Sequence, residues 1–334
     1  MKEITITKAQ AGQRMDRFLT RCLPGASGGF LHKMLRKKNI KLNGQKAEGS
    51  EKLQDGDKIQ IFFSDETYEK FCGKTEQAGD RSDQKKSRPR QDKLRRQVRL
   101  LYRDEDIVVL HKPAGLLSQK SEREDDSLND YLLDLCRREG WVSPEEMRYF
   151  HPSVANRLDR NTSGIVLCGI TTRGLQTLSQ ALRDRSISKY YMALVKGSVK
   201  EGRKIKGYLT KDHEKNLVHF SLTAGKDAMP IETEYQVLRS GQEASLLRIR
   251  LITGKSHQIR AHLATEGYPI LGDYKYGDRN ANQKLKLAEG ISTQMLHSCE
   301  INFGEHLGGL VIRDPLPEDF RKALHFYGLE WEER

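Results

Sequence analysis

The chain has 334 residues, which is more than one typical domain needs and enough for two. Its 58 Lys and Arg outnumber 46 Asp and Glu, and the formal charge of +12 favours a polyanionic partner such as nucleic acid. No apolar run approaches the length of a membrane span, and the N-terminal MKEITITKAQ has no apolar signal segment, so we expect a cytoplasmic protein with no membrane partner.

The first 66 residues are predicted to form a small unit with two helices and a hairpin. Ser27 is a candidate helix cap, and an Asn-Gly pair after IKL is the strongest short hairpin signal. Six cations and no acid lie between Ser27 and Lys46: Lys33, Arg36, Lys37, Lys38, Lys41 and Lys46. A basic helix followed by a hairpin resembles the ribosomal S-four-type (alpha-L) RNA-binding domain over residues 12–64. A solvated basic face is the alternative.

Residues 67–98 have the composition of a basic flexible linker. They lack hydrophobic periodicity and are rich in charge, Gly, Ser and Gln. Residues 72–99 hold ten Lys or Arg against four acids, a net of +6 and half the charge of the chain. The segment either orders on RNA or acts as a simple spacer.

Residues 99–334 are predicted to form an α+β domain with a mixed, largely antiparallel sheet. Strands are expected at 107–110, 188–197, 231–240 and 244–254, which is not the regular alternation of a parallel α/β fold. Helices are expected after a Thr171 or Thr172 cap, and from residue 255 to an end at Gly267.

No cofactor or metal site is predicted in either unit. TGKS at 253–256 suggests a phosphate-binding loop, but the required earlier glycine is Ile249. The five cysteines lie far apart without a CxxC pair, so neither a zinc site nor a disulfide framework is expected.

Several segments of the larger domain together carry a family signature. NRLDRNTSG at 156–164 resembles the HRLDxxTSG motif of the RluA-type pseudouridine synthases, the family of RluC and RluD. In the same order, the chain is similar to other elements of that family at 112–117 (KPAGLL), 188–197 (SKYYMALVKG), 253–277 (TGKSHQIRAHLATEGYPILGDYKYG) and 294–303 (QMLHSCEINF). An N-terminal S-four-type domain is a common attachment in this family.

The resemblance implies the pseudouridine synthase fold, RNA as the partner and three catalytic residues. Converting uridine to pseudouridine breaks N1–C1′ and forms C5–C1′, a redox-neutral isomerisation that needs no outside group donor. An ionised carboxylate can form and lose the required covalent bond, and a neighbouring cation favours its charged form. Asp159 is thereby identified as the nucleophile, Arg260 as its partner and Tyr191 as the residue that stacks on uracil and acts at C5.

Other residues are assigned to RNA binding and base flipping. Arg157 is expected to replace the flipped base or to contact a phosphate, and Arg160 and the N-terminal cations to bind the backbone. Asn156 stands where the family motif has His, and it can hydrogen-bond in that position. Large-subunit ribosomal RNA is the first expectation for the substrate and tRNA the second, with the protein acting as a monomer.

Two other functions remain open from the sequence. One is a non-catalytic RNA-binding or ribosome-assembly factor with the same fold. The other is a glycosidase with an aspartate nucleophile, which would need a second carboxylate as acid or base.

Overall fold

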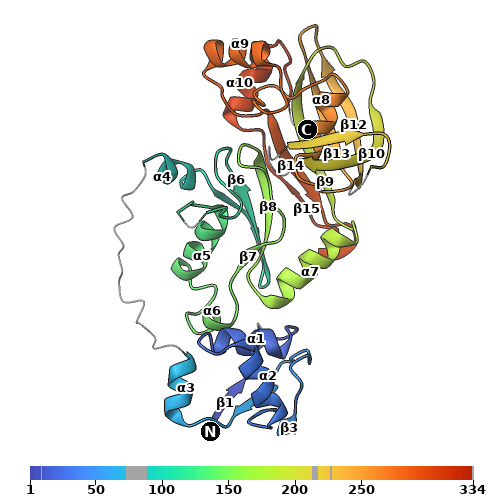
Figure 1. The fold of residues 1–334 in the computed structure, drawn as a ribbon. Helices are drawn as coiled ribbons and strands as arrows, with labels where there is room; N and C mark the ends of the chain where they lie inside the picture. Colours follow the sequence, from blue (N-terminus) through green and yellow to red (C-terminus); the bar gives the residue numbers. More distant parts are fainter. Residues whose placement is uncertain (9, 73–88, 123, 213–216, 226–227, 333–334) are drawn as a thin grey trace.

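The computed structural model describes residues 1–8, 10–72, 89–122, 124–212, 217–225 and 228–332. Figure 1 shows a small N-terminal unit beside a larger unit built on one long sheet. The N-terminal unit contains β1 (Lys2–Thr5), α1 (Met15–Cys22), α2 (Gly28–Arg36), β2 (Ile40–Leu42), β3 (Gln45–Lys46), β4 (Lys58–Ile61) and α3 (Asp65–Cys72).

The N-terminal unit folds around its own core. Its sheet has the order β1-β4-β2-β3 with antiparallel neighbours. The β2–β3 hairpin turns at Asn43 and Gly44, which both have positive φ, at 49° and 76°, as a two-residue hairpin requires. The predicted hairpin is therefore present.

Helix α2 has one buried and one basic face. Ser27 caps it, because its Oγ accepts a hydrogen bond from the Phe30 N–H at 3.3 Å, as predicted. Leu31, Met34 and Leu35 are buried. The exposed side of the helix and the residues that follow it carry Lys33, Arg36, Lys37 and Lys38.

The segment predicted as a linker begins and ends in helices. α3 belongs to the N-terminal unit, because Phe71 packs on Phe30 with ring centroids 4.6 Å apart. α4 (Pro89–Arg95) leads to Val98, which is buried in the core of the larger unit. Both helices are short and add few apolar residues, so composition did not indicate them. Residues 73–88, the rest of the predicted linker, lie outside the described part of the chain.

The larger unit is an α+β fold, as predicted. Its sheet runs β11-β10-β12-β13-β9-β14-β8-β6-β5, with β15 beside β14 and β7 beside β8. Only β14 and β8 pair in parallel among the described strands. The strands are β5 (Arg99–Arg103), β6 (Ile107–Lys112), β7 (Ser153–Val154), β8 (Ser163–Gly169), β9 (Ser188–Lys196), β10 (Arg203–Asp212), β11 (Leu217–Ser221), β12 (Met229–Ser240), β13 (Ala244–Leu251), β14 (Leu296–Asn302) and β15 (Val311–Arg313).

Helices flank this sheet and connect its strands (Figure 1). Thr171 caps α7 by accepting from the Gly174 N–H at 3.0 Å, which fits the predicted helix start. The helices are α5 (Leu128–Arg138), α6 (Glu146–Tyr149), α7 (Thr172–Arg183), α8 (Gln258–Thr265), α9 (Arg279–Glu289) and α10 (Glu318–Phe326), with a short 3₁₀ turn at His306–Gly309. No helix in the described part of the chain is both long and apolar enough to cross a membrane.

The parallel β8–β14 pair joins the two halves of the sheet at a point where only glycine fits. Gly164 pairs with Ser298 and has a φ of +114°. A Cβ at this position would lie 2.3 Å from the Ser298 carbonyl oxygen, so any side chain would force the strands apart. This junction directly follows the loop that carries Asp159.

The two units contact each other through α1, α6 and α7. The rings of Phe18 and Tyr149 stack with centroids 5.1 Å apart, and the Arg21 guanidinium donates to the Tyr149 carbonyl at 2.9 Å. The Gln176 amide donates to the Gly12 carbonyl at 2.8 Å. These contacts fix the N-terminal unit against the larger one.

Because two histidines are buried, we expect the folded protein to lose stability in acid. Burial lowers the pKa of His262 and of His297 from 6.5 to about 4, although Asp314 opposes the shift at His297. The unfolded chain therefore takes up protons below pH 6.5 that the folded rings take up only near pH 4. Stability is lost as pH falls through that window, by about 2 kcal/mol for each ring by pH 4.5.

Thermal unfolding at pH 7.5 and pH 4.5 tests this expectation with His262→Gln. The Gln side chain does not titrate, so the variant should lose about 2 kcal/mol less than the wild type between the two pH values. An equal loss in both proteins would show that His262 does not contribute.

Candidate active site

Asp159 lies in the loop between β7 and β8, at the start of the sheet junction. The Thr162 N–H donates to the Asp159 carbonyl at 3.1 Å, and the Gly115 N–H donates to the Arg160 carbonyl at 2.8 Å. Ser118 holds the preceding residue, because its Oγ donates to the Leu158 carbonyl at 2.9 Å and accepts from the Leu158 N–H at 3.0 Å. The backbone on both sides of the carboxylate is thus fixed.

Lys112 supports the same loop from inside the protein. It ends the buried strand β6, and its ammonium donates to the carbonyls of Pro113 at 3.1 Å, Leu116 at 2.7 Å and Arg160 at 3.0 Å. Burial lowers its pKa to about 7, while the charge of Asp159 opposes that shift. Lys112 begins the KPAGLL segment at 112–117, but no role for this lysine was predicted from the sequence. A lysine at the end of an apolar strand was the available signal.

Arg260 joins Asp159 to a second carboxylate. Its Nη1 donates to Asp159 at 2.7 Å, while Nε and Nη2 donate to the two oxygens of Asp273 at 2.7 and 2.9 Å. Burial disfavours the charged guanidinium, but the two carboxylates outweigh it and raise the pKa of Arg260 above its usual value. The predicted Asp159–Arg260 pair is present, and Asp273 orients the arginine.

A polar loop before α8 places Arg260. The Gln258 side chain accepts from the Thr253 hydroxyl at 2.9 Å and from the Lys255 N–H at 3.1 Å. It donates to the Glu232 carbonyl and the Thr233 hydroxyl, so TGKS at 253–256 is held as a structural loop. His257 has the left-handed φ of 54°, and its Nε2 lies 4.0 Å from Asp159.

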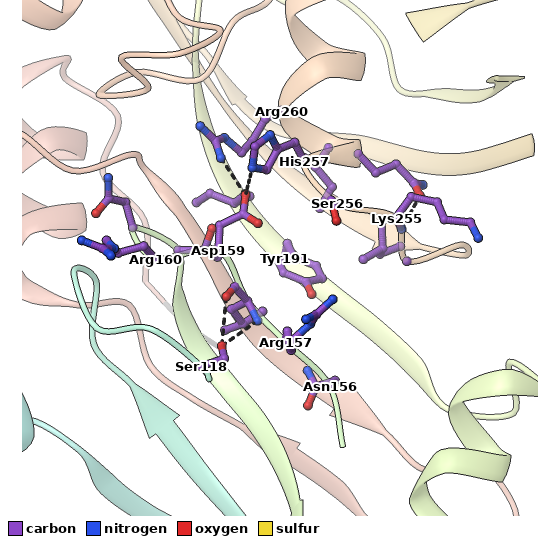
Figure 2. Close-up of a pocket in the computed structure, with 18 of the residues that line it drawn as sticks. Ser118, Asn156, Arg157, Asp159, Arg160, Tyr191, Lys255, Ser256, His257 and Arg260 are labelled. Atoms are coloured by element: carbon purple, nitrogen blue, oxygen red, sulfur yellow. Dashed lines mark hydrogen bonds and ion pairs between the residues drawn. The ribbon is translucent and has the colours of Figure 1, made fainter. Parts of the chain in front are cut away.

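Tyr191 lies on β9 between β13 and β14 and is 5% exposed. Figure 2 shows its ring beside Asp159, facing the same space as Arg260 and His257. Burial raises the pKa of its hydroxyl above the usual value, so the neutral phenol is strongly favoured. Tyr190 faces the other side of the strand, where the Arg248 guanidinium lies 4.3 Å from its ring centroid.

Asp159, Tyr191, His257 and Arg260 line a cavity of about 860 Å³. Asp159 is the only carboxylate among the described residues that line it, whereas seven lining residues are basic: Lys120, Arg157, Arg160, Lys189, Lys255, Arg260 and Lys275. Such a pocket suits an anionic substrate. A glycosidase would need a second carboxylate across the cavity, so the glycosidase alternative finds no support here.

The chain is similar in sequence to known pseudouridine synthases. A family profile described as RNA pseudouridylate synthase matches residues 106–265. The ribosomal large subunit pseudouridine synthase C of Escherichia coli (strain K12) is 29% identical over 331 residues, which cover 97% of this chain and 96% of that protein. The protein of that name from Pasteurella multocida (strain Pm70) is 27% identical over 330 residues and covers 97% of this chain and 93% of its own.

Residues 106–265 are thus similar to the RNA pseudouridylate synthase family, as the sequence motifs indicated. Two solved structures share the fold of this chain. Human RNA Pseudouridylate Synthase Domain Containing 4 has a TM-score of 0.58 at 23% identity, covering 72% of this chain and 97% of that one. Human RNA Pseudouridylate Synthase Domain Containing 1 has a TM-score of 0.50 at 19% identity, covering 65% and 83%. The predicted pseudouridine synthase fold is confirmed.

The other predicted site residues fall into two groups, those that line the cavity and those that do not. Asn156, Arg157 and Arg160 line the cavity, and Asn156 accepts a hydrogen bond from the Leu167 N–H at 2.7 Å. Asn156 thus ties the start of the Asp159 loop to β8. The second group, the exposed cations of the N-terminal unit, does not line the cavity: Lys33, Arg36, Lys37 and Lys38.

Proposed function

We propose that this protein is an RNA pseudouridine synthase that isomerises specific uridines of large-subunit ribosomal RNA to pseudouridine, with Asp159 as the nucleophile. The observation that carries the proposal is a single carboxylate, paired with a buried arginine, in a pocket whose other charged lining residues are cations. The cations attract the RNA backbone, and the carboxylate is the group able to form and lose a covalent bond. Attack at C6 of uracil, attack at C1′ of ribose and a glycal-type elimination all begin from this carboxylate.

Tyr191 is proposed to stack on the uracil and to act near C5. Its position beside Asp159 supports stacking, which requires no change in charge. The raised pKa means that the phenol would have to pass its own proton on before it could accept one from C5. Positioning of the base is therefore the role that its surroundings support best.

The target base is proposed to leave its stack in order to reach Asp159. Arg157 lies on the cavity wall two residues before Asp159, and its side chain is exposed. It is thus able to take the space of the flipped base, or to hold a phosphate of the opened strand. Arg160 is exposed on the other side of Asp159 and is proposed to bind the backbone.

The choice of RNA rests on the curated relatives and on the N-terminal unit. The relatives are named as ribosomal large subunit enzymes and match 97% of this chain, the N-terminal unit included. That unit combines a basic helix with a hairpin, which supports its assignment as an alpha-L RNA-binding domain. We take tRNA as the second choice, a monomer as the working form and the cytoplasm as the location, in keeping with five free thiols.

Tritium release from RNA labelled at uridine C5 tests the proposal, because pseudouridine formation exchanges that hydrogen with water. Large-subunit ribosomal RNA and bulk tRNA, both from cells that lack this enzyme, are offered separately. We expect release from ribosomal RNA and much less from tRNA. Tight binding of both RNAs without release from either would favour a non-catalytic assembly factor instead.

The N-terminal cations should contribute to RNA binding through phosphate contacts. Replacing Lys33, Arg36, Lys37 and Lys38 together by Gln should weaken binding and flatten its salt dependence. Each lost contact changes the slope of log affinity against log salt by roughly 0.7 to 0.9, so the total change should approach about 3. Filter binding of large-subunit ribosomal RNA at several salt concentrations measures the slope.

A matched variant removes four exposed cations from α9 and α10 instead, by Gln substitution of Lys284, Lys286, Arg321 and Lys322. Its slope should stay close to that of the wild type. Equal slopes for both quadruple variants would mean that the N-terminal unit does not contact RNA in the proposed way.

A further inference from the structure

Lys189 is a cation on the cavity wall that the proposed chemistry does not use. It lies on β9 two residues before Tyr191, and side chains at this spacing share one face of a strand. The cavity that contains Asp159 is lined by both residues. Lys189 therefore faces the space where the proposed reaction occurs.

Lys189 has no anionic partner. Among the described residues, no carboxylate lies within ion-pair distance of its ammonium, and no hydrogen bond is present there. Burial, and next the charge of Arg185, lower its pKa. Holding a partly buried ammonium without a partner is unfavourable, so the site is suited to an anion that comes from outside the protein.

The loop opposite Lys189 approaches its ammonium closely. Gly254 also lines the cavity, and a Cβ built on it would lie 3.3 Å from the Lys189 ammonium. A side chain at residue 254 would therefore crowd the ammonium. The neighbouring Lys255 adds a further positive charge to the cavity lining.

We propose that Lys189 binds a backbone phosphate of the nucleotide that enters the cavity, and so positions its uracil against Tyr191 and Asp159. Phosphate is the anion that every RNA nucleotide carries, and ammonium–phosphate hydrogen bonds are charge-assisted. The inference rests on the proposed function. It adds a substrate contact for a residue that takes no part in the covalent steps.

The test compares Lys189→Met and Lys189→Arg with the wild type on C5-tritiated large-subunit ribosomal RNA. Loss of a charge-assisted contact should raise KM about 10- to 100-fold in Lys189→Met, with kcat within about threefold of the wild-type value. Lys189→Arg should restore most of the lost affinity, because it keeps the charge. The control Lys200→Met removes an exposed cation that lies beyond the same strand and outside the cavity, and should leave KM unchanged.

Binding measured without turnover separates this inference from the proposed function. In filter binding to unlabelled RNA, Lys189→Met should flatten the salt slope by roughly 0.7, and Lys200→Met should not. An unchanged slope in Lys189→Met would overturn the inference, whatever its activity. A wild type that binds RNA with the expected slope but releases no tritium would count against the proposed reaction and not against the phosphate contact.

Gly254→Ala gives a second, independent variant. It should raise KM severalfold in the wild-type background by crowding the ammonium, but have little further effect on Lys189→Met, because residues in contact are not additive. Full additivity of the two changes would contradict the predicted link between Gly254 and Lys189.

Discussion

Asp159→Asn should abolish turnover while leaving most of the RNA affinity. The amide has the size of the carboxylate but no charge and no nucleophilic oxygen, so we expect the single-turnover rate to fall about a thousandfold or more. The basic lining of the cavity is unchanged, so the Kd for large-subunit ribosomal RNA should stay within about threefold. Tritium release and filter binding measure the two effects separately.

Asp125→Asn is the matched control for this substitution. Asp125 contacts Arg160 at 3.9 Å but does not line the cavity. Arg160 is exposed and Asp125 is only partly buried, so weakening this pair should change the rate less than about threefold. A normal rate in Asp159→Asn would show that another group is the nucleophile. An equal loss of rate in both variants would show that disturbance of the loop, and not loss of the Asp159 carboxylate, lowers the rate.

Arg260→Met should reduce both stability and turnover. The substitution leaves the buried Asp273 carboxylate without its bidentate partner and frees Asp159 to move. Breaking one side of a buried ion pair costs about 3 to 5 kcal/mol, and misplacing a reacting group can cost about 100-fold in rate. Arg260→Lys should be the more stable variant but still slow, because an ammonium does not reproduce the planar fork.

The double variant Arg260→Met with Asp273→Asn separates the two effects. Removing the buried, unpaired charge of Asp273 should raise the Tm above that of Arg260→Met alone. Turnover should stay low, because Asp159 still lacks its arginine. Recovery of turnover along with Tm would mean that Arg260 acts only through stability. Thermal unfolding and single-turnover tritium release on the same preparations decide between the outcomes.

Local chemistry made several elements predictable from sequence. A serine or threonine hydroxyl can cap a helix from its own first turn, which is why Ser27 and Thr171 indicated where α2 and α7 begin. Asn43 and Gly44 tolerate positive φ, which was enough to predict the β2–β3 turn. The short helices α3 and α4 showed no cap or turn signal in the sequence. Contacts with the rest of the fold hold them, and such contacts are not visible in the local sequence.

The candidate site was predictable only in part. The family resemblance identified Asp159, Tyr191 and Arg260, and the structure brings all three together around one cavity. The supporting residues were missed. Asp273 orients Arg260 by accepting its hydrogen bonds. Lys112 supports the Asp159 loop because its ammonium donates to the Arg160 carbonyl, 48 residues further along the chain.

The sequence by itself determined the chemical groups, the caps and turns, and the excess of positive charge. These depend on residue types and on neighbours within a few positions. Only the tertiary structure decided which groups meet, such as Asp159 and Arg260, which lie 101 residues apart. It also decided which charges are paired, as for Arg260, and which have no ion-pair partner among the described residues, as for Lys189. Burial and pairing are properties of the packed chain, because desolvation and ion pairing depend on distances in space that residue order does not specify.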